Sequence, residues 1–83
     1  MYKFTCLEEG YEDQGVNRET FAEAFADMYR YVTKLVDGGY CSWQVLETWH
    51  WIETPSRIPI FWYDARDRAY DEGIMEDGNL MSP

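Results

Sequence analysis

The chain has 83 residues, which we expect to form one domain over residues 1–83. Sixteen acidic and seven basic residues give a formal net charge of −9, and 18% of the residues are aromatic. A surface of this charge repels nucleic-acid phosphates and anionic lipids, so we expect no direct nucleic-acid binding and no membrane binding. Because no segment approaches the about 20 apolar residues of a membrane span, and the N-terminal residues form no apolar leader, we expect a cytoplasmic protein.

The first predicted element is a strand over residues 2–9. Aromatic residues alternate there with small or polar ones, which places Tyr2, Phe4 and Cys6 on one face of the strand. Residues 11–15 are polar and are predicted to form a loop that leads into the next element.

The second predicted element is a long helix over residues 16–39. Its apolar residues recur every three or four positions and so share one stripe of the helix surface: Phe21, Phe25, Met28, Val32, Leu35 and Val36. Asn17 is the preferred N-cap, and the pattern from Thr20 to Glu23 is a second possible capping box that would start the helix one turn later. The pair at positions 38–39, both glycine, supplies the left-handed residue that commonly ends a helix.

Residues 40–53 are rich in aromatic and β-branched side chains, which favours one long strand, with a helix as the alternative. In a strand, His50 would point away from its two neighbours Trp49 and Trp51. We expect the long helix to make a crossover connection, which would bring this strand parallel to the first one.

The last predicted element is a helix over residues 58–73, with Pro59 in its first turn and Gly73 as its C-cap. Ile58, Phe61, Trp62, Ala65 and Ala69 would share its buried face. The alternative is a strand over residues 58–63 that forms a hairpin with residues 49–53, followed by a helix that starts at Asp64.

These elements follow one another in the order β-α-β-α. They predict an α+β domain in which a two-to-three-stranded sheet packs against one long and one shorter helix. The tail, residues 74–83, is acidic and rich in turn residues, so we expect it to be mobile unless Leu80 and Met81 hold it down.

Few residues suggest a reaction centre. His50 and Cys41 are the candidates for general-base and nucleophilic catalysis, but no spacing around them matches a catalytic motif, and a structural histidine is the favoured interpretation. A zinc site needs about four ligands, whereas the sequence offers only these two residues and Cys6, so we expect no metal and no cofactor. In a cytoplasmic protein, Cys6 and Cys41 are expected to be reduced rather than joined in a disulfide.

Two groups of residues are candidates for an interaction surface. The first is acidic and comprises Glu8, Glu9, Glu12, Asp13, Asp64, Asp67, Asp71 and Glu72. The second is aromatic and comprises Trp43, Trp49, Trp51, Trp62 and Tyr63. Acidic groups attract basic partners, and large rings commonly anchor protein interfaces.

The sequence therefore favours a non-catalytic protein–protein interaction module that docks on a basic, nucleic-acid-binding partner protein. In size and charge the chain resembles the small acidic inhibitors that phages make against host defence, including anti-CRISPR proteins, which would place it in the host cytoplasm. One alternative is a small-ligand-binding domain with an aromatic cleft. In this alternative, two copies of the chain could form a homodimer that buries the aromatic rings in excess of those needed for the core. The other alternative is a small enzyme that uses His50 and Cys41.

Overall fold

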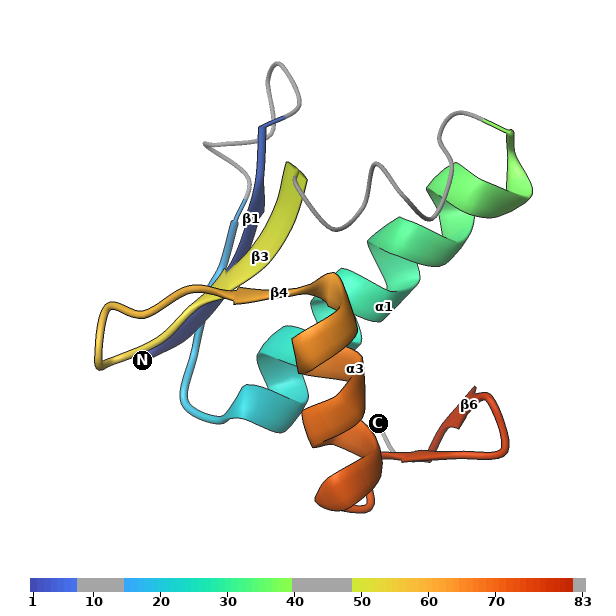
Figure 1. The fold of residues 1–83 in the computed structure, drawn as a ribbon. Helices are drawn as coiled ribbons and strands as arrows, with labels where there is room; N and C mark the ends of the chain where they lie inside the picture. The colour runs from blue at the N-terminus through green and yellow to red at the C-terminus, as the bar shows by residue number, and fades with distance from the viewer. Residues whose placement is uncertain (8–14, 40–48, 82–83) are drawn as a thin grey trace.

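A long helix lies against one face of an antiparallel sheet in the computed structural model of the chain, which describes residues 1–7, 15–39 and 49–81 (Figure 1). Within these residues four strands form the main sheet, in the order β2-β1-β3-β4, and two further strands form a C-terminal hairpin. The elements are β1 (Tyr2–Cys6), β2 (Asn17–Arg18), α1 (Phe21–Asp37), β3 (His50–Glu53), β4 (Ile60–Phe61), α3 (Trp62–Asp71), β5 (Met75–Glu76) and β6 (Asn79–Leu80).

The α+β class, with two helices and antiparallel sheets, is confirmed, but the topology differs from the expected one. β3 pairs with β1 in the antiparallel direction, so the expected parallel pairing of these strands is wrong. The reason is the short strand β2, which pairs with the other side of β1 and was not predicted. Because β2 and β3 are both antiparallel to β1, α1 connects two strands that are parallel to each other and separated by β1. The main sheet also has more strands than the two or three expected.

Helix α1 begins later than the preferred prediction and at its alternative cap. The side chain of Thr20 accepts a hydrogen bond from the backbone N–H of Glu23 at 3.2 Å, as an N-cap residue does. Asn17, the preferred cap, instead lies opposite Lys3 in the β1–β2 pair. At the other end, Gly39 has a φ of +75°, which confirms the predicted left-handed residue after the helix.

The core forms between α1 and the sheet. The predicted stripe of α1 supplies Phe21, Phe25, Met28 and Val32, which are all buried, while its last two members, Leu35 and Val36, are half-buried. The inner face of the sheet supplies the buried residues Phe4, Cys6, His50 and Ile52. Alternation along β1 and β3 therefore works as predicted for the described residues, with His50 on the opposite face from Trp51.

The segment from Ile58 onward has the order of the alternative prediction, a hairpin followed by a helix, but with other bounds. The strand is Ile60–Phe61 rather than residues 58–63, and the helix starts at Trp62 rather than at Asp64. β4 pairs with β3 in the register Trp51↔Phe61 and Ile52↔Ile60, and Ile58 is 68% exposed, so the predicted helix start at residues 58–59 is wrong. A proline disfavours the helical conformation in the residue before it, which fits the position of Ile58, before Pro59, outside the helix.

Helix α3 then turns its predicted small residues into the core. Trp62 stacks on Phe25 with ring centroids 6.1 Å apart, and Ala65 and Ala69 are fully buried. Gly73 ends the helix with a φ of +75°, and the N–H of Ile74 donates to the carbonyl oxygen of Ala69 at 2.8 Å. This is the Schellman arrangement, and it confirms Gly73 as the predicted helix end.

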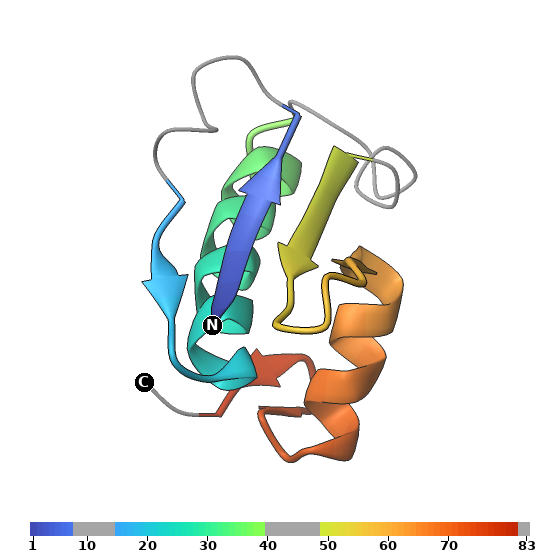
Figure 2. The same ribbon diagram turned by 90° about the vertical axis from the view of Figure 1, so that its left-hand side faces the viewer.

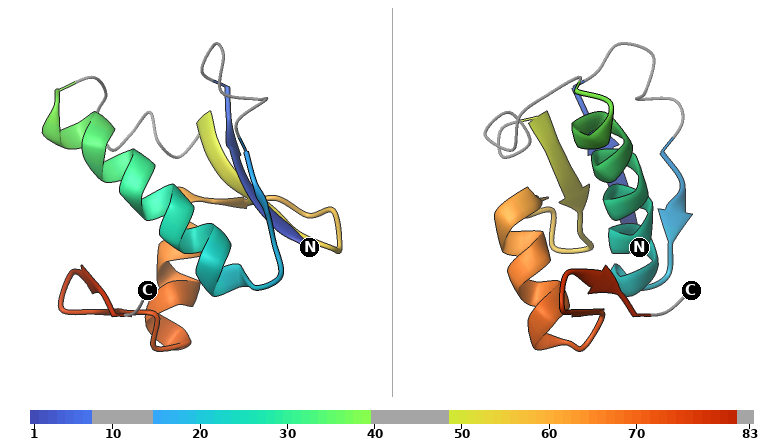
Figure 3. Two further views of the ribbon diagram at one scale, coloured as in Figure 1. Left: turned by 180° about the vertical axis from the view of Figure 1, so that it is seen from behind. Right: turned by 90° about the vertical axis from the view of Figure 1, so that its right-hand side faces the viewer.

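The C-terminal hairpin is attached to both helices (Figure 3). The hydroxyl of Tyr29 donates to the carbonyl oxygen of Gly78, and the N–H of Gly78 donates to the hydroxyl oxygen of Tyr70, both at 3.0 Å. Met75 is buried in the core, and Leu80 packs against the core, whereas Met81 is exposed. The main anchor is therefore Met75, which the sequence analysis did not select.

Candidate binding surface on the outer sheet face

The sheet has a second face, which points away from α1 and which we call the outer face. It carries the alternate side chains of the strands: Lys3, Thr5, Trp51, Glu53 and Phe61. Figure 2 shows β1 and β3 in front of α1, with neither α1 nor α3 lying over this face. Neither described helix therefore covers the outer face, although Thr5 on it is only 7% exposed.

Two aromatic rings lie side by side on the outer face, on β3 and the edge strand β4. Trp51 and Phe61 are cross-strand partners in the β3–β4 pair, and their ring centroids lie 5.7 Å apart with planes tilted by 43°. Both residues are half-buried, so part of each ring meets solvent. A cross-strand aromatic pair stabilises a hairpin, and rings held rigidly in this way bind a partner at little entropic cost.

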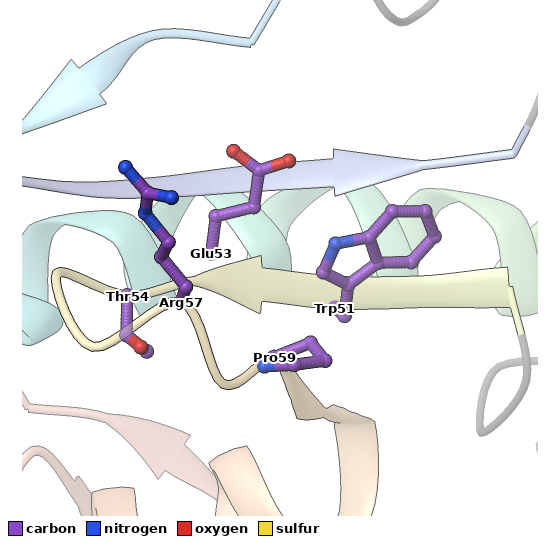
Figure 4. Close-up of a pocket in the computed structure, with 5 residues that line it drawn as sticks. All are labelled: Trp51, Glu53, Thr54, Arg57 and Pro59. Carbon is purple, nitrogen blue, oxygen red and sulfur yellow. The ribbon is translucent and has the colours of Figure 1, made fainter.

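A pocket of about 310 Å³ adjoins this pair. Figure 4 shows its lining residues, Trp51, Glu53, Thr54, Arg57 and Pro59, which come from β3 and from the loop that joins β3 to β4. The size is near the lower end of the range for small-molecule sites, about 300–1,000 Å³.

Hydrogen bonds within the β3–β4 loop fix the shape of the pocket. The hydroxyl of Thr54 donates to the carbonyl oxygen of Ile58 at 2.9 Å, and the N–H of Arg57 donates to the carbonyl oxygen of Thr54 at 2.9 Å. Arg57 itself has a φ of +66°, a backbone conformation that residues other than glycine rarely adopt. The loop is thus held in one conformation by its own contacts, so this wall of the pocket is formed before any ligand arrives.

The charges at the pocket are of both signs. Glu53 is exposed, and within residues 1–7, 15–39 and 49–81 no ion pair involves its carboxylate. Arg57 is also exposed, and it lies at the far end of the pocket from Trp51 (Figure 4). The pocket therefore offers an indole ring, a carboxylate and a guanidinium group to a ligand.

A second charged surface is the outer side of α3. The predicted acidic residues Asp64, Asp67, Asp71 and Glu72 are all exposed there. Glu72 accepts a hydrogen bond from Arg68, and this bond raises the pKa of the Arg68 guanidinium above its ordinary value. The other three carboxylates take part in none of the ion pairs of the described chain, so they remain available to a basic partner.

The predicted aromatic surface residues do not stay together. Trp62 is 2% exposed and belongs to the core, so its assignment to the interaction surface is corrected: it directly follows β4 and turns inward at the start of α3. Trp49 is 46% exposed, and Tyr63 is half-buried with the Arg66 guanidinium 5.3 Å from its ring centroid. Trp51 lines the pocket formed by β3 and the β3–β4 loop.

Some predicted residues lie outside the described residues, and their positions stay predictions. They are Glu8, Glu9, Glu12, Asp13, Cys41 and Trp43. The expectation that Cys6 and Cys41 are reduced stays a prediction for the same reason.

His50 is a core residue. It is fully buried, and its ring stacks on the Phe4 ring with centroids 6.2 Å apart. The Tyr31 ring also packs against it, with 5.9 Å between the centroids of the Tyr31 and His50 rings. Its cross-strand partner is Cys6, which is also buried. A substrate would reach either side chain only if the core opened, so the geometry offers no accessible reaction centre at these two residues.

Four residues on or beside the outer face were not predicted as site residues: Glu53, Arg57, Pro59 and Phe61. The preferred prediction places Phe61 on the buried face of a helix and Pro59 in the first turn of that helix, with Glu53 at a strand end and Arg57 in a turn. The alternative prediction of a hairpin could have indicated this site. Pairing residues 49–53 with residues 58–63 brings Trp51 opposite Phe61.

None of the described helices is both long enough and apolar enough to cross a membrane. No protein-family model, no curated protein and no solved structure matches this chain.

Proposed function

We propose that the protein is a non-catalytic interaction module that binds a basic partner protein through its outer sheet face and the acidic surface of α3. The observation that carries the proposal is the Trp51–Phe61 pair. Two large rings are held side by side on the face that points away from the core, where they add little to the packing against α1. Partly exposed rings on a rigid sheet are suited to anchor a partner.

The charge of the molecule supports a basic partner. With a formal net charge of −9, the chain attracts cationic surfaces over about 8–10 Å at physiological salt. Attraction of this kind speeds the encounter between two proteins and excludes acidic partners. Proteins that bind nucleic acids carry basic surfaces, so an inhibitor that covers such a surface is the form of this function that we favour, as with phage anti-defence proteins.

Affinity capture from a lysate of the source cells tests the proposal. The immobilised chain is incubated at about 0.1 M and about 0.5 M salt, and the bound proteins are identified by mass spectrometry. We expect basic proteins at the low salt concentration and their loss at the high one. A triple variant, D64N/D67N/D71N, should capture less of the same proteins.

The control variant for this capture experiment, D37N/E76Q/D77N, removes the same charge from exposed sites outside α3. Capture that is equal for both variants and at both salt concentrations would contradict the proposal.

A second candidate function is the binding of a small aromatic or sugar-like ligand, and the pocket beside Trp51 favours it. Native mass spectrometry of protein purified from the source cells is the appropriate measurement. A constant extra mass would support this function, and the bare chain mass in every preparation would oppose it. The same spectra would reveal a homodimer.

A further inference from the structure

We propose that the pocket beside Trp51 receives an arginine side chain of the partner, with the guanidinium group held between the Trp51 indole and the Glu53 carboxylate. This inference rests on the proposed function for the existence of a basic partner. It adds the chemical group that is recognised and the two residues that recognise it.

The spacing of the two residues on β3 suits a planar cation. Trp51 and Glu53 are two positions apart on one strand, so their side chains leave the same face about 6.6 Å apart. A guanidinium group stacks on an indole at about 3.5–4 Å, and its N–H groups donate hydrogen bonds to a carboxylate at about 2.8 Å between nitrogen and oxygen. Both contacts can therefore form at once, and Figure 4 shows the indole and the carboxylate on the same side of β3.

The chemistry of the lining favours a cation over a neutral group. The face of a tryptophan ring attracts cations more strongly than that of any other aromatic side chain. The Glu53 carboxylate is not neutralised by an ion pair in the described part of the chain. Arginine fits better than lysine because its planar group can stack on the ring and donate two hydrogen bonds to a carboxylate together.

The positive charge of Arg57 is expected to oppose the binding of an arginine side chain in this pocket. Its guanidinium lies at the other end of the same pocket, where it repels an incoming cation. Removing this charge should therefore strengthen arginine binding, whereas removing the Glu53 charge should weaken it. If the pocket instead bound an acidic group through Arg57, both effects would have the opposite sign.

The test uses the full chain and three peptide probes of the form acetyl-Gly-X-Gly-X-Gly-amide, where X is arginine, citrulline or glutamate. Citrulline has nearly the shape of arginine but no charge. Dissociation constants are obtained by NMR titration at low salt. We expect binding of the arginine peptide and at least about fivefold weaker binding of the citrulline peptide.

Four variants locate the site. We expect Glu53→Gln and Trp51→Leu each to weaken arginine-peptide binding by about threefold to tenfold, and Arg57→Gln to strengthen it by about twofold. Glu76→Gln removes the same charge as Glu53→Gln from the exposed C-terminal hairpin and should change binding by less than about 1.5-fold. Glu53 and Arg57 are exposed, so their variants should fold, and thermal unfolding of each variant checks this.

Equal effects of Glu53→Gln and Glu76→Gln, or tighter binding of the glutamate peptide than of the arginine peptide, would overturn the inference. The proposed function fails separately. If a captured basic partner binds Glu53→Gln as well as the unaltered chain, the pocket assignment is wrong and the function stands. If the arginine peptide binds as expected but no basic protein is captured, the function is wrong and the pocket assignment stands.

Discussion

Trp51 and Trp62 lie eleven positions apart in similar aromatic surroundings, yet one faces outward and the other is buried. The difference comes from where β4 ends. Phe61 is the last strand residue and points to the outer face, so the next residue, Trp62, points inward and stacks on Phe25. Residue type alone could not predict this, because a shift of one residue exchanges the two faces.

This assignment predicts unequal costs for the same substitution. Trp62→Ala should lower the free energy of unfolding by about 3–5 kcal/mol, because it leaves a cavity beneath α3. Trp51→Ala should cost less than half as much, since its ring is already partly in water. Chemical denaturation of both variants measures the two values. A cost for Trp51→Ala equal to that for Trp62→Ala would mean that the outer face is covered, and the proposed binding surface would be lost.

At the scale of elements, α1 was the most predictable part of the chain. Its apolar stripe and its glycine end were identified from the sequence, because periodicity over 17 residues leaves few other arrangements. β2 could not be predicted, because its two polar residues carry no strand signal and pair only where β1 offers a free edge. β4 was found as the alternative, since its cross-strand partners are apparent only once the hairpin is assumed.

The helix start is a direct test of the element boundaries. Thr20→Ala should lower the free energy of unfolding by about 1 kcal/mol, because the N–H of Glu23 loses its acceptor. Asn17→Ala should change it by less than about 0.5 kcal/mol, since Asn17 is exposed in β2. Urea unfolding of the two variants decides between the caps, and a larger loss for Asn17→Ala would restore the earlier helix start.

The C-terminal hairpin depends on two tyrosine hydroxyls that meet at Gly78. In a double variant, Tyr29→Phe with Tyr70→Phe, both hydrogen bonds are lost while the rings remain. At about 1 kcal/mol for each bond, amide exchange at Met81, whose N–H donates to Ile74, should become roughly thirtyfold faster. Exchange at Ile52 in the core should change much less. Unchanged exchange at Met81 would show that Met75 and Leu80 hold the hairpin without these bonds.

At the scale of the whole molecule, the order of the predicted strands and helices indicated the fold class but neither the topology nor the site. An aromatic content of 18% in 83 residues indicated that some rings would lie outside the core, and Trp51 and Phe61 are such rings. Which rings they are follows from the sheet order, and that order depends on contacts between distant segments. The pocket could not be predicted because its lining comes from a loop conformation set by Thr54 and Arg57.

The proposed function requires that an acidic surface with aromatic anchors binds a basic protein. The most direct test is the dissociation constant of the captured partner, measured from about 0.05 M to about 0.5 M salt for the unaltered chain and for the D64N/D67N/D71N variant. We expect affinity to fall by at least about tenfold over this range for the unaltered chain, and by clearly less for the variant, because three charges no longer take part. An affinity that is independent of salt, or an identical salt dependence in both proteins, would contradict the claim.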